Sequence, residues 1–109
     1  MDSFYALAEP KRRKIMELIA VNGRLSATEI SSKFDITAQA ISQHLNMLLS
    51  AKLLIVHRHA QRRIYEINPN EMMEVEEWTK KTLKMWNERF DRLDKVLKWE
   101  KKKLRKTNC

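Results

Sequence analysis

The feature that most constrains the fold is a pair of capped helices separated by a very short turn. Ser26 and Glu29 stand three residues apart, as in a capping box, where the serine caps the early amides and the glutamate reaches back. Thr37 is placed to cap a second helix with one apolar side, made of Ile41, Leu45, Leu48 and Leu49. Asp35 and Ile36 leave room only for a tight turn, and aspartate tolerates the positive φ that such turns often need. Together these elements predict a helix-turn-helix.

Two helices are expected before this pair. Phe4 and Leu7 indicate a short opening helix that breaks at Pro10. Proline suits the first position of the next helix, since its missing N–H has no partner there. Gly23 is expected to end that second helix in the left-handed conformation that glycine adopts without strain.

The pattern changes to a period of two after the helix pair. Residues 54–58 include the β-branched Ile55 and Val56, and residues 63–67 alternate polar and apolar, with a polar tip between them. We therefore expect a β-hairpin closed by Asn68 and Pro69. From Glu71 to about Lys106 nothing breaks a helix. The predicted fold class is mainly α with a small β-hairpin: a winged helix-turn-helix with a long C-terminal dimerisation helix.

A length of 109 residues leaves room for one packed core. We expect a winged helix-turn-helix DNA-binding domain over residues 1–69. The long dimerisation helix, over 70–106, is assigned to the same compact domain, and residues 107–109 to a flexible tail.

One side of the predicted fourth helix carries the chemistry that reads bases. At 100° per residue its polar side chains share a face about 100° wide, opposite the apolar side. Short amide and hydroxyl groups both donate and accept at base edges. The candidate DNA-binding residues on this helix are Thr37, Ala38, Gln39, Ser42, Gln43 and Asn46.

The formal net charge of +8 points toward an anionic partner, either nucleic acid or an acidic surface, but it is unevenly placed. Residues 1–69 hold 10 basic and 6 acidic side chains, net +4, whereas residues 95–109 hold 7 and 1, net +6. Arg58, Arg62 and Arg63 flank the hairpin tip, where arginine enters a minor groove or clamps a phosphate; a plain solvated hairpin is the other interpretation. The basic run over residues 11–14 fits either backbone contacts or ordinary surface charge.

The last helix has an apolar seam with spacings of 3, 4, 3 and 4, typical of a helix packed along another helix. Its members are Leu83, Trp86, Phe90, Leu93 and Leu97. A long helix with this seam would expose a large apolar patch in a monomer. We therefore expect a homodimer, with Phe4 and Leu7 of the opening helix joining the contact.

Three local phrases carry a family resemblance. Residues 4–15 (FYALAEPKRRKI), 40–45 (AISQHL) and 63–68 (RIYEIN) resemble the opening helix, recognition helix and second wing strand of ArsR-type winged-helix repressors. The match runs in order over residues 3–69. It implies a dimeric, sequence-specific transcriptional repressor that binds double-stranded DNA at an inverted repeat. By this resemblance Ala38, Gln39, Ser42 and Gln43 face the major groove, and Arg62 and Arg63 serve the wing.

The sequence departs from the family pattern at two places. The wing tip, His59-Ala60-Gln61, lacks the glycine that is often found there, which leaves the turn open. His44 lies at the border of the polar and apolar faces and fits either packing or a DNA contact.

Metal binding, catalysis and membrane insertion are not expected. Some family members bind metal through a Cys-x-Cys pair on the third helix, or Asp and His along the last one. Here residues 29–34 hold no cysteine, and the last helix offers Asp91 and Asp94 without histidine. His57 and His59 make at most half a site between arginines, and Cys109 stands alone at the terminus.

We therefore expect no metal, no cofactor and no evident small-molecule effector. No nucleophile, base and orienting group occur together, so an enzyme is not expected. With no leader and no long apolar run, the chain is expected in the cytoplasm. The alternative function is a winged-helix module that binds protein or RNA through the long helix and basic tail.

Overall fold

The computed structural model describes residues 2–107, and the side chains of residues 96, 98 and 100–107 lie outside the description. Cys109 and most of the predicted tail are therefore outside the described residues. The chain divides into two units, Met1–Val75 and Glu76–Cys109. Each unit is considered by itself below.

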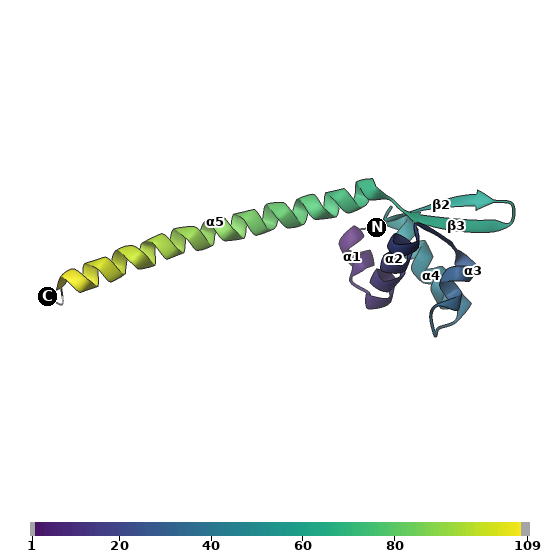
Figure 1. Ribbon diagram of the computed structural model, residues 1–109, viewed down its shortest axis with the longest axis horizontal. Helices are drawn as coiled ribbons and strands as arrows, with labels where there is room; N and C mark the ends of the chain where they lie inside the picture. Colours follow the sequence, from purple (N-terminus) through teal and green to yellow (C-terminus); the bar gives the residue numbers. More distant parts are fainter. Residues whose placement is uncertain (1, 108–109) are drawn as a thin grey trace. The chain divides into compact units, whose positions relative to one another are not determined.

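The first unit holds four helices, a three-stranded antiparallel sheet and the start of a fifth helix (Figure 1). The helices are α1 (Ser3–Leu7), α2 (Pro10–Asn22), α3 (Ala27–Ser32) and α4 (Ala38–Ser50). The strands are β1 (Arg24–Ser26), β2 (Leu54–His59) and β3 (Arg62–Ile67), in the order β1-β3-β2. The last helix, α5, runs over Pro69–Thr107 and so begins two residues before the position expected from sequence.

The predicted fold class, a winged helix-turn-helix with a long C-terminal helix, is confirmed, with one strand added to the predicted hairpin. The dimerisation role of the long helix stays a prediction. β1 pairs with β3, with Arg24 opposite Glu66 and Ser26 opposite Ile64. Three residues are too few to show a period of two, and Ser26 also begins the next helix, so sequence periodicity missed this strand. The added strand ties the hairpin to the helix pair.

The caps of the helix pair are confirmed. The Ser26 hydroxyl accepts a hydrogen bond from the Glu29 amide at 3.1 Å, and the Glu29 carboxylate accepts one from the Ser26 amide. The Thr37 hydroxyl accepts from the Ala40 amide, also at 3.1 Å. The expectation of a positive φ at Asp35 was wrong: among the described residues only Gly23, Lys52 and Ala60 have one. Helix α3 already ends at Ser32, so the turn has five residues and needs no left-handed backbone.

A single core fixes how α4 is oriented. Seven side chains drawn from α2, α3, α4 and the residue before β2 are almost completely buried: Ile15, Ile19, Ile30, Ile41, Leu45, Leu48 and Leu53. Tyr65 of β3 closes this core beside them. Because three of these residues lie on the inner side of α4, the opposite side of that helix must face outward.

A left-handed residue ends α4 and directs the chain into the hairpin. Lys52 has φ 63°, its amide donates to the Leu49 carbonyl, and the Leu53 amide donates to the Leu48 carbonyl, each at 3.0 Å. This is a Schellman motif, with buried Leu48 and Leu53 as its apolar contact. Lysine occupies the position that glycine usually takes, so the motif carries backbone strain.

The wing turn also has a residue other than glycine in the left-handed conformation. His59 pairs with Arg62, which leaves Ala60 and Gln61 as a two-residue loop. Ala60 takes φ 59° at the first loop position. The hairpin therefore closes tightly, with alanine in a conformation that glycine adopts at lower cost.

The first turn of α5 is attached to α1. The Ser3 hydroxyl donates to the Glu71 carboxylate at 2.8 Å, and Asn68 caps the helix by accepting from the Asn70 amide. Met72 packs against the core.

The second unit consists of the rest of α5. Its exposed large apolar side chains include all five residues of the predicted seam: Leu83, Trp86, Phe90, Leu93 and Leu97. Within the described residues, no helix combines the length and apolarity needed to cross a membrane.

Candidate nucleic-acid interface

The outer face of α4 presents the side chains that sequence analysis selected for base reading. All six are exposed: Thr37, Ala38, Gln39, Ser42, Gln43 and Asn46. The face carries no formal charge, so its groups are free of the strong hydration that ionised side chains hold. Its amides and hydroxyls match the donors and acceptors of a DNA major groove.

A cleft of about 230 Å³ separates this face from the wing. Ala38 and Ser42 line it from α4, and Arg63 lines it from β3. Thr28 and Ser31 of α3 complete its polar wall. These two hydroxyls were not among the residues predicted from sequence, although their spacing of three places them on one side of α3.

The three wing arginines have different neighbours. Arg58 lies directly opposite Arg63 on the neighbouring strand, so two like charges share the face of the sheet that looks toward α4. Of the three, only Arg63 lines the cleft beside Ala38 and Ser42. Arg62 lines a neighbouring pocket together with Arg63 and Thr28, and its Nη2 lies 3.6 Å from the Glu29 carboxylate. Both partners of that pair are more than half exposed, so it adds little stability. Arg63 is therefore the arginine next to the candidate reading face.

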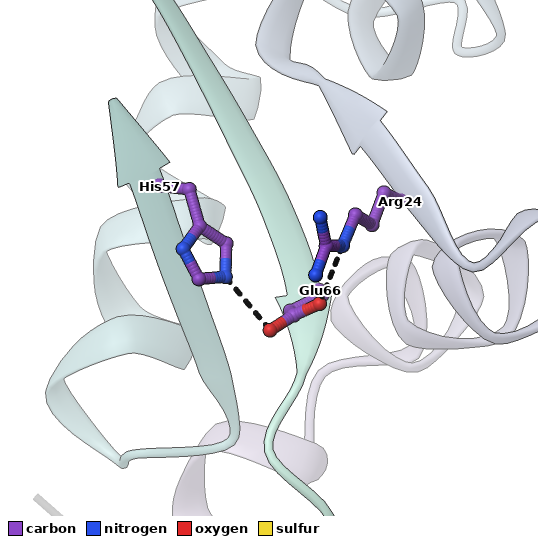
Figure 2. A network of polar contacts seen from close by, with 3 residues as sticks. All are labelled: Arg24, His57 and Glu66. Atoms are coloured by element: carbon purple, nitrogen blue, oxygen red, sulfur yellow. Dashed lines mark hydrogen bonds and ion pairs between the residues drawn. The ribbon is translucent and has the colours of Figure 1, made fainter. Parts of the chain in front are cut away.

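A polar network on the outer side of the sheet holds its three strands together (Figure 2). The Glu66 carboxylate on β3 accepts from Arg24 Nε on β1 and pairs with His57 Nε2 on β2, each at 2.7 Å. The hydrogen bond from His57 and then that from Arg24 lower the pKa of Glu66. Since one carboxylate joins all three strands, it orients the wing relative to the helix pair.

His44 lies on the edge of the reading face and is only partly buried. Its Nδ1 lies 3.5 Å from Nη1 of Arg12 on α2. Burial, followed by the Arg12 charge, lowers the pKa of His44 below its ordinary value of 6.5. The imidazole is therefore neutral at pH 7.

The predicted dimerisation residues have different surroundings. On α1, Leu7 packs partly against the core, whereas Phe4 is 43% exposed. On α5, the seam residues Trp86 and Phe90 are 58% and 59% exposed, with ring centroids 6.3 Å apart and tilted by 47°. These apolar surfaces are what an interface between two chains would cover.

Metal-ligating side chains do not gather in the described part of the chain, where no three of His, Cys, Asp and Glu come together. Of the two wing histidines, His57 is engaged with Glu66.

Known proteins share the domain that carries these residues. Residues 7–57 match a family model described as a helix-turn-helix domain. The chain is 35% identical over 75 residues to the transcriptional repressor SdpR of Bacillus subtilis, covering 69% of this chain and 82% of SdpR. It is 30% identical over 69 residues to the arsenical resistance operon repressor of the same organism, covering 63% of this chain and 66% of the relative.

Solved structures share the fold. An ArsR-like transcriptional regulator from Rhodococcus sp. RHA1 superposes with a TM-score of 0.75 at 20% identity, covering 85% of this chain and 87% of that one. The match extends the likeness beyond the helix-turn-helix to most of the chain.

Proposed function

Because the chain belongs to the ArsR family of DNA-binding transcriptional regulators, which are not enzymes, we propose that it is a homodimeric repressor occupying an inverted-repeat operator. Each copy places α4 in a major groove and reads base edges with Gln39, Ser42, Gln43 and Asn46. It acts in the cytoplasm and needs no metal or cofactor to bind DNA.

The observation that carries this proposal is the uncharged, exposed face of α4 beside Arg63. A guanidinium at the edge of the cleft supplies a phosphate contact, which sets register without reading sequence. The neighbouring hydroxyls of Thr28 and Ser31 add donors for the same backbone. Bases are read by neutral groups and phosphates are held by charged ones, the division expected of a sequence-specific binder.

Dimerisation follows from the exposed seam on α5. A helix with five large apolar residues at alternating spacings of three and four packs along a second such helix. The symmetric partner is another copy of this chain, because a two-fold interface uses the same residues on both sides. Two copies then address half-sites one or more helical turns apart, which requires an operator with inverted symmetry.

The test separates reading residues from positioning residues. On the preferred duplex, Gln39→Ala or Ser42→Ala relaxes base preference at particular positions, by about 1–3 kcal/mol for a lost bidentate contact and less for a single bond. Arg63→Ala weakens specific and random duplexes alike and lowers the salt dependence. Fluorescence anisotropy against a set of single-base variants at two salt concentrations measures both effects.

Asn22→Ala is the matched control, since Asn22 is an exposed amide on α2, far along the chain from the reading face. It should leave affinity and base preference unchanged. Equal losses on specific and random DNA for Gln39→Ala, Ser42→Ala and Arg63→Ala would contradict the assigned roles. Binding of RNA or a protein in place of duplex DNA would favour the alternative function.

A further inference from the structure

A second groove, of about 420 Å³, lies on the side of α4 away from the wing. Its walls are Arg12 from α2 and five residues of α4: Gln43, His44, Asn46, Met47 and Ser50. Among these described lining residues there is no carboxylate. The groove therefore offers a guanidinium, an imidazole, two amides and a hydroxyl, which are donors suited to an anion.

Arg12 is held in place by the backbone of α1. Its Nε donates to the Ala6 carbonyl at 2.6 Å, and its Nη2 donates to the Tyr5 carbonyl at 3.3 Å. In the described part of the chain no carboxylate pairs with this guanidinium. Two backbone anchors and no neutralising partner leave a fixed positive charge at the groove, with N–H groups to spare.

His44 is the second donor. In its neutral form Nδ1 accepts from Arg12 Nη1, so Nε2 carries the proton and donates. Three charged groups from the start of α2 act on this imidazole: Arg12 and Lys11 oppose its protonation, and Glu9 favours it. An anion bound in the groove would offset the two cations.

We propose that this groove binds a phosphate of the DNA backbone, with Arg12 as the fixed charge and His44 as a donor that takes up a proton at Nδ1 on binding. The protonated Nδ1 no longer accepts from Arg12 Nη1, so that N–H turns to the phosphate while Nε and Nη2 stay on their backbone carbonyls. The proposal rests on the proposed function and deepens it. Gln43 and Asn46 belong both to the reading face and to the groove, so a duplex seated on α4 carries its backbone past Arg12. Arg63 then holds the backbone on the wing side, and Arg12 holds it on the α2 side.

Proton uptake gives the site a signature that a structural role would lack. Free His44 has a lowered pKa and is neutral at pH 7, whereas a phosphate beside it favours the charged imidazole and raises that pKa. DNA binding is then tighter at pH 6 than at pH 7.5. The gain in DNA-binding affinity on lowering the pH is limited to about tenfold per pH unit for each His44 that takes up a proton.

The experiment measures affinity for the preferred duplex and a random duplex, across pH 5.5–8 and several salt concentrations. Arg12→Ala should weaken both duplexes about tenfold for each phosphate lost. In a dimer with two such contacts the slope of log K against log salt should shrink by about 1.8. Arg12→Lys should restore most of that slope. His44→Gln should retain a donor and lose the pH dependence. Because His57 and His59 are present in both proteins, the comparison isolates His44.

Arg13→Ala is the matched control. Arg13 also holds α1, by donating to the Leu7 and Ala8 carbonyls at 2.6 and 3.1 Å, but it does not line the groove. Arg13→Ala should lower the free energy of unfolding about as much as Arg12→Ala does. It should not reduce the slope of log K against log salt. Thermal unfolding of every variant shows whether the fold is kept. A His44→Gln protein with wild-type pH dependence, or an Arg12→Ala loss no larger than that of Arg13→Ala, overturns the proposal.

An NMR titration of the His44 imidazole distinguishes the sources of phosphate. We expect a shift with duplex DNA at micromolar concentration and none with inorganic phosphate at the same concentration. A shift with inorganic phosphate but none with DNA would make this a free-anion site and overturn the assignment. If all variants bind the operator as wild type does, only this inference fails; if no duplex is bound specifically, the proposed function fails.

Discussion

Trp86→Ala should separate the two copies of the protein, because Trp86 belongs to the apolar seam and carries its largest side chain. The side chain is 58% exposed in the single chain. For a ring system of roughly 250 Å², covering that fraction removes about 145 Å² from water. At about 25 cal/mol per Å² this contributes roughly 3.5 kcal/mol per chain. Both copies lose this contribution in the variant dimer. Even if only about 4 kcal/mol of the combined loss appears in the binding free energy, the dimer dissociation constant should rise by about three orders of magnitude.

Sedimentation velocity over a range of micromolar concentrations measures the change. Wild type should sediment as a dimer and Trp86→Ala as a monomer at the same concentration. Trp99→Ala is the matched control: Trp99 is 62% exposed, and at 100° per residue it lies about 180° from Phe90, on the other side of α5. The seam is refuted if Trp86→Ala stays dimeric, or if Trp99→Ala dissociates the dimer equally.

Two further predictions concern stability. Lys52→Gly should raise the free energy of unfolding by about 0.5–1 kcal/mol, because glycine relieves the left-handed strain at the end of α4; urea denaturation measures it, and Lys52→Ala should give no such gain. Glu66→Gln should destabilise the protein at pH 7. Bonds from His57 and Arg24 lower the pKa of Glu66, so its contribution is present above the ordinary value of 4.5 and fades as pH falls through the folded value. The two melting curves should therefore converge in acid, and a constant difference down to pH 3 would contradict this origin.

The sequence was most informative where local chemistry decides the structure. Ser26, Glu29 and Thr37 begin their helices as predicted, because a cap needs only a short polar side chain at a fixed spacing. The apolar period of α4 also predicted its orientation. Because Ile41 and Leu45 are buried on one side of the helix, the polar side must face outward.

Features that depend on tertiary neighbours were not predictable. Strand β1 is too short to show a pattern and exists because β3 offers it an edge. Lys52 and Ala60 adopt positive φ although neither is a turn-forming residue, because the packed elements on both sides fix the chain direction. Arg58, Arg62 and Arg63 looked equivalent, but of the three only Arg63 lines the cleft beside α4, and Arg62 pairs with Glu29. The Arg12–His44 groove joins residues 32 positions apart and has no sequence signature.

The most direct test of the central claim is selection of duplexes from a randomised pool by the full chain, followed by sequencing. We expect one inverted repeat with half-site centres about one helical turn, or a multiple of it, apart. Two chains should bind each selected duplex. Enrichment of a single unrepeated site, or of no sequence at all, would contradict a homodimer that reads DNA through the outer face of α4.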